Sequence, residues 1–285
     1  RAVQSALDQT WPYLQVQIVV ANGLSIAESV VLPDEARVQI FQSSTPLSRS
    51  AAANQSLALA SGRFALFLDD DDWLLPHHIE RLVHALNFHP RAAAAHADVE
   101  CLHHIGATLA HSRTFDEAVS PVDMQLRNCL PIHSTLFRTA VARQSPALQF
   151  NPGLDYFEDW DFWVQLLARG SFVHVPGVSA IYQISDSEGS GHEVTGRLRR
   201  EQLTVFGELQ LQRWSGSDVA DLIEHHAANI HATELLQKEL VTTLAALDAQ
   251  RAASDAFQRR LNESAQYIRT LLEETNLLRV QRDDA

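Results

Sequence analysis

Segments with the pattern of β-strands alternate with segments with the pattern of α-helices over the first two thirds of this 285-residue chain. Strand-like apolar runs occur at residues 14–20, 36–42 and 63–68, and helix-like runs lie before, between and after them. Strands separated by helical segments favour an α/β fold, in which a mainly parallel sheet is flanked by helices. We therefore expect this fold, with any ligand bound at the carboxyl ends of the strands.

Four consecutive aspartates, Asp69 to Asp72, directly follow the third apolar run. Like charges this close repel one another, and burying any of them is costly. A solvated turn would explain the cluster, and so would a positive group bound there. Alternate carboxylates leaving a strand point the same way, and Mg²⁺ or Mn²⁺ prefers carboxylate oxygens. Asp69 with Asp71, or Asp71 with Asp72, is thus a candidate pair for holding a metal–diphosphate.

A second acidic cluster, Glu158, Asp159 and Asp161, lies at the expected start of an amphipathic helix. The helix dipole stabilises carboxylates at this position, so helix capping alone would explain them. An aspartate fixed there would alternatively accept a proton from a sugar hydroxyl. The neighbouring rings of Trp160 and Trp163 would then offer a stacking platform for a sugar face.

Composition excludes two classes of partner. The formal net charge is −13, which leaves no basic surface for nucleic-acid binding. No apolar run approaches the roughly 20 residues that cross a bilayer. The two cysteines, Cys101 and Cys129, lack metal-site spacing and indicate reduced thiols in a cytoplasmic protein.

The chain beyond residue 197 shows helical patterns and no strand-like runs. From Leu236 to Leu278, positions at alternating steps of four and three residues are apolar in eight of thirteen cases. This pattern predicts a coiled coil and a homo-oligomer, although a single helix packed on the domain remains an alternative. We expect three regions: an α/β domain, a helical region and a coiled coil, at residues 1–193, 194–232 and 233–285.

Several motifs, in order along residues 2–185, resemble the inverting family-2 glycosyltransferases. The family has an Asn-containing helix, then a Gly, an apolar strand, an Asp-x-Asp-Asp motif and a Pro. It also has a later Glu-Asp-Trp-Asp segment, which fits "EDWDFW". The matching residues of the first part are Asn54, Gly62, Phe67, Leu68, Asp69, Asp71, Asp72 and Pro76.

The resemblance implies the fold of the nucleotide-diphospho-sugar transferases. It also implies metal-dependent transfer of a sugar from a nucleotide-diphosphate donor to a hydroxyl acceptor, with inversion at the anomeric carbon, in polysaccharide or glycan assembly. Asp71 and Asp69 would bind Mn²⁺ or Mg²⁺, and Asp72 would support the metal or contact the donor sugar. Asp159 would be the general base.

The remaining residues implied by the resemblance are expected to contact substrates. Glu158 and Asp161 would position the acceptor or cap the helix, while Asn54 and Trp160 would lie at the donor or acceptor.

Two departures from the family pattern are visible. The family's first strand is absent, because the chain begins within the next helix. Its usual pair of acids is replaced by Ala21 and Asn22, of which Asn22 would still hydrogen-bond a base edge. Arg49 would substitute for the arginine that usually stands at position 53.

These departures favour an alternative, a non-catalytic glycosyltransferase-like module that acts as a scaffold through its coiled coil. A nucleotidyltransferase is a third hypothesis, but its Gly-rich, Lys-containing phosphate signature is not visible.

Overall fold

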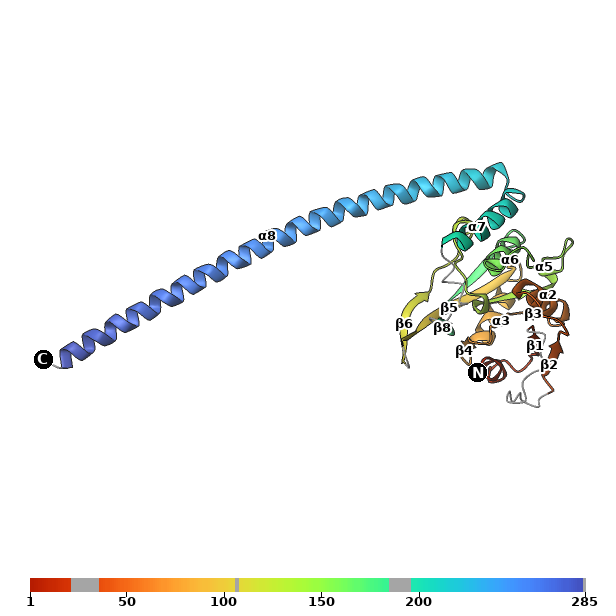
Figure 1. Cartoon of the computed structure of the whole chain (residues 1–285), viewed down its shortest axis with the longest axis horizontal. Coiled ribbons are helices and arrows are strands. Elements are labelled where there is room, and N and C mark those ends of the chain that lie inside the picture. Colours follow the sequence, from red (N-terminus) through yellow and green to blue (C-terminus); the bar gives the residue numbers. More distant parts are fainter. Residues whose placement is uncertain (22–35, 106–107, 185–195, 284–285) are drawn as a thin grey trace. The chain divides into compact units, whose positions relative to one another are not determined.

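The computed structural model describes residues 1–21, 36–105, 108–184 and 196–283. The chain forms two compact units, Arg1–Asp218 and Val219–Ala285. The helices of the first unit are α1 (Ala2–Leu7), α2 (Arg49–Leu59), α3 (His78–Phe88), α4 (Pro121–Leu126), α5 (Thr139–Ala142), α6 (Glu158–Leu167) and α7 (Gly196–Leu211), with a short 3₁₀ helix, η1 (Ile132–Ser134) (Figure 1).

The larger sheet of the first unit is mixed. Its strand order is β3-β7-β5-β8-β4, with β6 also paired to β5. The long strands β5 and β8 are parallel, whereas β3, β4, β6 and β7 pair antiparallel with their neighbours. The bounds are β3 (Phe64–Ala65), β4 (Trp73–Leu74), β5 (Ala94–Ile105), β6 (Thr108–Phe115), β7 (Thr135–Arg138) and β8 (Phe172–Ile184).

The expected α/β class is therefore confirmed, but the expectation of a mainly parallel sheet is corrected. Two of the antiparallel pairs involve β3 and β4, of two residues each, which flank the aspartate turn and pair with β7 and β8; in the other two, β5 pairs with β6 and with β7. A purely parallel sheet would need a long crossover between each pair of strands.

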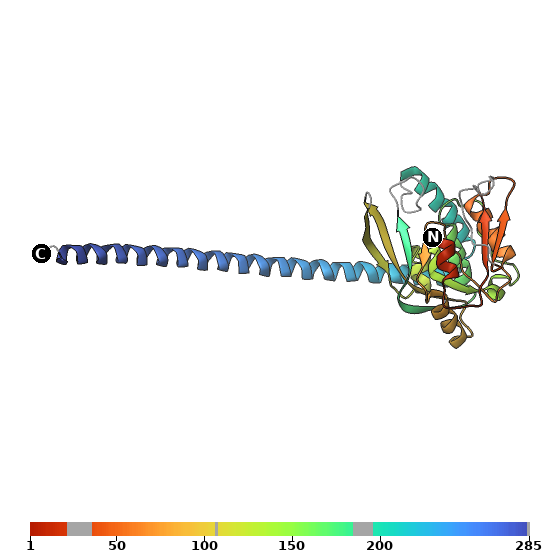
Figure 2. The same ribbon diagram turned by 90° about the horizontal axis from the view of Figure 1, so that it is seen from below.

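A second, two-stranded sheet is formed by β1 (Val16–Val20) and β2 (Val38–Gln42), which are parallel. Within the described residues no ladder joins it to the larger sheet. Figure 2 shows its orange-red strands on the other side of the domain from the yellow-brown hairpin strand β6.

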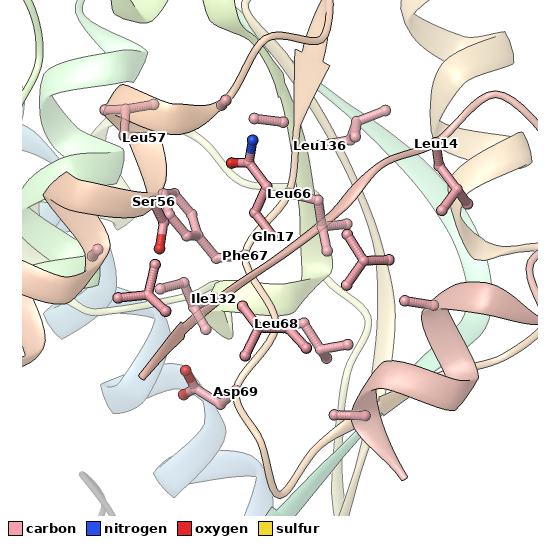
Figure 3. Close-up of a pocket in the computed structure, with 18 of the residues that line it drawn as sticks. Leu14, Gln17, Ser56, Leu57, Leu66, Phe67, Leu68, Asp69, Ile132 and Leu136 are labelled. Atoms are coloured by element: carbon pink, nitrogen blue, oxygen red, sulfur yellow. The ribbon is translucent and has the colours of Figure 1, made fainter. Parts of the chain in front are cut away.

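A cavity of about 1120 Å³ separates β1 from residues 64–68. Figure 3 shows Gln17 of β1 pointing into it beside Leu66 and Phe67, with Asp69 at one end. The expected strand at residues 63–68 is in a ladder only over Phe64–Ala65. Residues 66–68 pair with no strand of the described chain and line this cavity.

The apolar core holds α6 in place. Phe162 stacks on Phe150 with ring centroids 4.4 Å apart, and Trp163 packs edge-on against Phe137 at 6.2 Å. All four side chains are fully buried. Because α6 is fixed by this packing, the acids of its first turn have a defined position.

The second unit consists of the long helix α8 (Gly216–Asp283), labelled in Figure 1. The boundary between the two units lies at Asp218. The region boundaries expected from the sequence, after residues 193 and 232, stay predictions. Among the described helices, none has a stretch long and apolar enough to cross a bilayer.

Candidate active site

The four consecutive aspartates occupy different environments. They form the turn between β3 and β4, where the Asp72 N–H donates to the Asp69 carbonyl at 3.3 Å. Asp70 and Asp71 are exposed, Asp69 is partly exposed and Asp72 is fully buried. The turn therefore presents Asp69, Asp70 and Asp71 to ligands and turns Asp72 inward.

Asp72 is held by two groups from other elements. Its Oδ1 accepts the backbone N–H of Gln183 at 2.8 Å, and its Oδ2 lies 2.9 Å from Nδ1 of His133. Both side chains of the Asp72–His133 pair are buried. These contacts connect the turn to η1 and to the end of β8, so Asp72 fixes the turn in place.

Arg49 is the positive group that joins the two acidic clusters. It is the first residue of α2, whose N-terminus is capped by the Ser48 side chain. Its Nε donates to Oε1 of Glu158 at 2.8 Å, and its Nη2 lies 3.5 Å from Oδ2 of Asp69. The two acidic clusters, far apart in the sequence, are therefore adjacent in the structure.

Burial and mutual repulsion perturb the acids around Arg49. Burial raises the pKa of Asp69 to about 6, although Arg49 opposes the shift. Burial and the charge of Asp159 raise the pKa of Glu158 to about 7, again against Arg49. Burial alone would lower the pKa of Arg49, but the charges of Glu158 and Asp69 outweigh it and raise that pKa.

Asp159 is oriented at the start of α6. Its Oδ2 accepts a hydrogen bond from Nδ2 of Asn128 at 3.0 Å, and its Oδ1 accepts the Trp160 backbone N–H at 2.7 Å. Phe157, just before the helix, has a φ of 67°, a left-handed conformation that a bulky residue adopts only when its surroundings enforce it. Burial raises the pKa of Asp159, while the Asn128 hydrogen bond lowers it.

A second cavity, of about 400 Å³, lies on the Asp159 side of Arg49. Asp159 and Asn128 line this cavity, whereas Asp70 and Asp71 line the larger one. The two cavities meet at residues that line both of them. These shared residues are Arg49, Asp69, Ile132, Glu158 and Tyr182.

The expected sugar platform is wrong. Trp163 is fully buried in the core. Trp160 stacks on Phe206 of α7 at 4.0 Å between ring centroids, and its indole N–H donates to the Met124 carbonyl. Trp160 lines the second cavity, but with its ring packed in this way only 6% of the residue is exposed, so it offers little surface to a sugar.

Asp161 and Asn54 also differ from the expectation of substrate contact. Asp161 is fully buried and accepts hydrogen bonds from Gln210 and Gln165 at 3.0 and 2.8 Å, and from Arg213. It therefore anchors α6 to the end of α7. Asn54 uses both polar atoms of its side chain on the backbone of Phe150, at 2.8 Å each.

Asn22, the expected base-binding residue, lies outside the described residues. Three residues of the site were not predicted from the sequence: Asn128, His133 and Tyr182. His133 and Asn128 lie in or just before residues 130–138, "LPIHSTLFR", a short segment in which polar residues interrupt apolar ones. That segment was the signal that could have led to them.

The carboxylates of the aspartate turn suit a hard divalent cation that takes its remaining ligands from substrate and water. In the described part of the chain no cluster of three or more His, Cys, Asp or Glu residues is suited to a metal. Mg²⁺ usually takes one or two carboxylates and completes its shell with phosphates and water. Asp69 and Asp71 are two such carboxylates. Desolvation together with the charge of Asp72 raises the pKa of both, so added positive charge there would be stabilising.

Comparison with known proteins identifies the family of this domain. Residues 1–138 match the family described as Glycosyl transferase family 2. The chain carries a family-2 glycosyltransferase domain. This confirms the resemblance and the class of enzyme that it implied.

Two curated relatives of this family-2 domain are named uncharacterized glycosyltransferases. The one from Haemophilus influenzae is 25% identical over 227 residues, which cover 72% of this chain and 69% of the relative. The other, YwdF from Bacillus subtilis, is 24% identical over 210 residues, covering 72% of this chain and 76% of the relative.

Solved structures of S. aureus TarS, residues 1–349, share the fold. The complex with UDP gives a TM-score of 0.50 at 16% identity and covers 65% of this chain and 56% of that one. The complex with UDP-GlcNAc gives 0.50 at 15%, covering 68% and 56%. The chain thus spans just over half of these structures. This likeness concerns the fold alone, the GT-A type of glycosyltransferase that the resemblance implied.

Proposed function

We propose that this domain transfers a sugar from a nucleotide-diphosphate donor to a hydroxyl acceptor, with a divalent metal and with inversion. The observation that carries the proposal is the meeting of two cavities at Arg49, Asp69 and Glu158. A donor in the larger cavity and an acceptor in the smaller one would meet at this boundary. The UDP and UDP-GlcNAc bound to TarS support a nucleotide-sugar as the donor.

On the donor side, Asp69 and Asp71 would hold Mn²⁺ or Mg²⁺. The metal would neutralise the diphosphate as it leaves, which is Lewis-acid chemistry. Asp72 would take no direct part, because Gln183 and His133 already hold its carboxylate. Its role is to keep Asp69 and Asp71 in position.

On the acceptor side, Asp159 would be the general base. The acceptor hydroxyl gives its proton to a carboxylate oxygen of Asp159 as its own oxygen bonds to the anomeric carbon. The bond from that carbon to the diphosphate breaks on the opposite face, which inverts the configuration. Asn128 orients the base through Oδ2, and a raised pKa makes Asp159 a stronger base than an exposed aspartate.

The test is nucleotide release from a panel of UDP- and GDP-sugars with Mn²⁺ and saccharide acceptors. Asp71→Asn and Asp159→Asn should each abolish release. Asp155→Asn is the matched control, because Asp155 is exposed and lines neither cavity. Full activity of Asp71→Asn or Asp159→Asn would contradict the corresponding role.

The cavity beside β1 supports the expectation of one further strand. A strand there would pair with β1 on one side and with residues 66–68 on the other. The coding sequence upstream of Arg1 tests this proposal. It should encode an apolar strand-forming segment, and a stop codon or a wholly polar stretch would contradict it.

A non-catalytic binding module is the alternative function. Ala21, where the family has an acid, favours it. Calorimetry with Mn²⁺ and nucleotide-sugars, together with the nucleotide-release assay, separates the two functions. A binding module would bind the donor but would not release nucleotide in the presence of acceptor. Polysaccharide or glycan assembly and a cytoplasmic location stay part of the main proposal.

A further inference from the structure

The long helix α8 exposes large apolar side chains along its length. Between 41% and 65% of the surface of each of these side chains is accessible: Val219, Leu236, Leu240, Leu247, Phe257 and Leu261. In proteins, most of the stability of a helix comes from packing its apolar face against other groups. A partner that covered these side chains would therefore stabilise the helix.

These six residues fall on one stripe with a repeat of seven residues. Three further exposed residues, Ile223, Ile230 and Leu244, lie beside it. The stripe can be followed from Val219 to Leu278 in steps of three and four, and ten of its eighteen positions are apolar. The ten are Val219, Leu222, Leu236, Leu240, Leu247, Phe257, Leu261, Ile268, Leu271 and Leu278.

The opposite side of the same helix is polar by comparison. The twenty-seven positions farthest from the stripe, up to residue 280, contain only four large apolar residues, Leu235, Val241, Leu277 and Val280. A repeat of 3.5 residues with this contrast is the pattern of a left-handed coiled coil.

The polar positions within the stripe identify the partner. Asn229, Thr243 and Gln250 are among eight polar residues that interrupt the apolar positions. In a parallel pair of identical helices in register, each residue meets its own copy. Every polar residue then faces a polar residue, and all ten apolar residues face apolar ones. Paired polar layers of this kind fix the register of coiled coils.

An antiparallel pair with the same overlap matches the stripe less well. It would place Leu222 opposite Thr275, Leu247 opposite Gln250 and Ile268 opposite Asn229. Each of these layers would bury a polar group against an apolar one, which is unfavourable.

Charges beside the stripe agree with the parallel arrangement. In parallel coiled coils, the residue just before the first apolar position of a seven-residue repeat lies beside the residue five positions further along the sequence of the other helix. Along the stripe this spacing produces no pair of like charges. We propose that α8 binds a second copy of this chain as a parallel, in-register two-stranded coiled coil through the stripe from Val219 to Leu278.

Light scattering after gel filtration tests the partner. The chain should elute with twice its mass of 31.7 kDa. The double variant Leu240→Asp/Leu247→Asp should be monomeric, because it places charges in two apolar layers. The control Leu235→Asp/Val241→Asp changes two exposed residues outside the stripe and should stay dimeric.

Circular dichroism of the same variants shows whether the α/β domain is still folded, so a monomer is not mistaken for an unfolded chain. A monomeric wild-type chain, a trimer, or equal behaviour of the two double variants would overturn the proposal. A chain that pairs only when a different protein is added would also overturn it.

A disulfide tests the orientation. Ser264→Cys should form a covalent dimer on mild oxidation, because in a parallel pair the two cysteines face each other. In the antiparallel pair, residue 264 would lie opposite residue 233 of the other helix. Residues 233 and 264 are roughly 45 Å apart along a helix, so the two cysteines would be too far apart to bond. The wild-type chain under the same oxidation is the control for Cys101 and Cys129. A dimer that does not cross-link at position 264 would overturn the parallel assignment.

Discussion

Nε of Arg49 donates a hydrogen bond to Oε1 of Glu158 across 2.8 Å and so joins the start of α2 to the start of α6. The same guanidinium group lies 3.5 Å from Asp69. One positive charge therefore serves two acids from clusters that are far apart in the sequence. It only partly offsets their burial, since the pKa of both acids is still raised, to about 7 for Glu158 and about 6 for Asp69.

The raised pKa of Glu158 predicts that stability falls as the pH rises. The folded protein binds this proton more tightly than the unfolded chain, whose glutamate has the ordinary pKa of 4.5. The resulting stabilisation is complete below about pH 4.5 and is lost as the pH rises through about 7. Urea unfolding between pH 4.5 and 7.5 should show the loss, on the order of 1–3 kcal/mol.

Glu158→Gln is the control for this prediction, because a glutamine Oε1 still accepts the hydrogen bond from Arg49 and does not titrate. The variant should show a shallower dependence on pH than the wild-type protein. Equal slopes for the two proteins would mean that Glu158 has an ordinary pKa in the folded state.

The pairing of Asp72 with His133 predicts a strong energetic coupling. Both side chains are buried, and removing one leaves the other without its partner. Asp72→Ala and His133→Ala should each destabilise the protein by about 3–5 kcal/mol. The double variant should cost clearly less than the sum of the two. Chemical denaturation measures all three, with Asp70→Ala as an exposed control from the same turn, and additive costs would show that the residues act independently.

The strand, helix and turn that carry the site were predictable from the sequence because they depend on local residue patterns. The apolar run at residues 14–20 became β1, Val16–Val20. The acids at residues 158–161 open α6, as a helix dipole favours. The four aspartates directly follow an apolar run, and this alone predicted that they lie at the carboxyl end of a strand.

Contacts between distant segments were not predictable in this way. No local pattern shows that His133 reaches Asp72 or that Asn128 reaches Asp159. The amphipathic pattern around Trp160 likewise indicates that α6 has a buried face, but not that Phe206 of a later helix covers this ring.

The hydrogen bond from Asn128 predicts an altered pH dependence of catalysis. This bond lowers the pKa of Asp159, so Asn128→Ala should raise that pKa and keep the base protonated to a higher pH. We expect kcat to fall most at low pH and to recover as the pH rises, because the base is deprotonated again there. A pH–rate profile measures the shift.

Asn151→Ala is the matched control for this prediction. Its side chain accepts the Gly153 backbone N–H at 2.8 Å, and Asn151 lines neither cavity. Its profile should keep the wild-type shape. A loss of kcat in Asn128→Ala that is equal at every pH would contradict the role given to Asn128.

The packing of Trp160 predicts that its replacement affects stability rather than acceptor binding. Trp160→Phe keeps a ring against Phe206 but leaves the buried Met124 carbonyl without its donor. The free energy of unfolding should fall by about 1–3 kcal/mol, and the KM for the acceptor should stay within about twofold of the wild-type value. Trp160→Ala removes the ring as well and should lower stability by about 3–5 kcal/mol. A KM that rises about tenfold in Trp160→Phe, without a change in unfolding, would restore this tryptophan as a platform for the sugar.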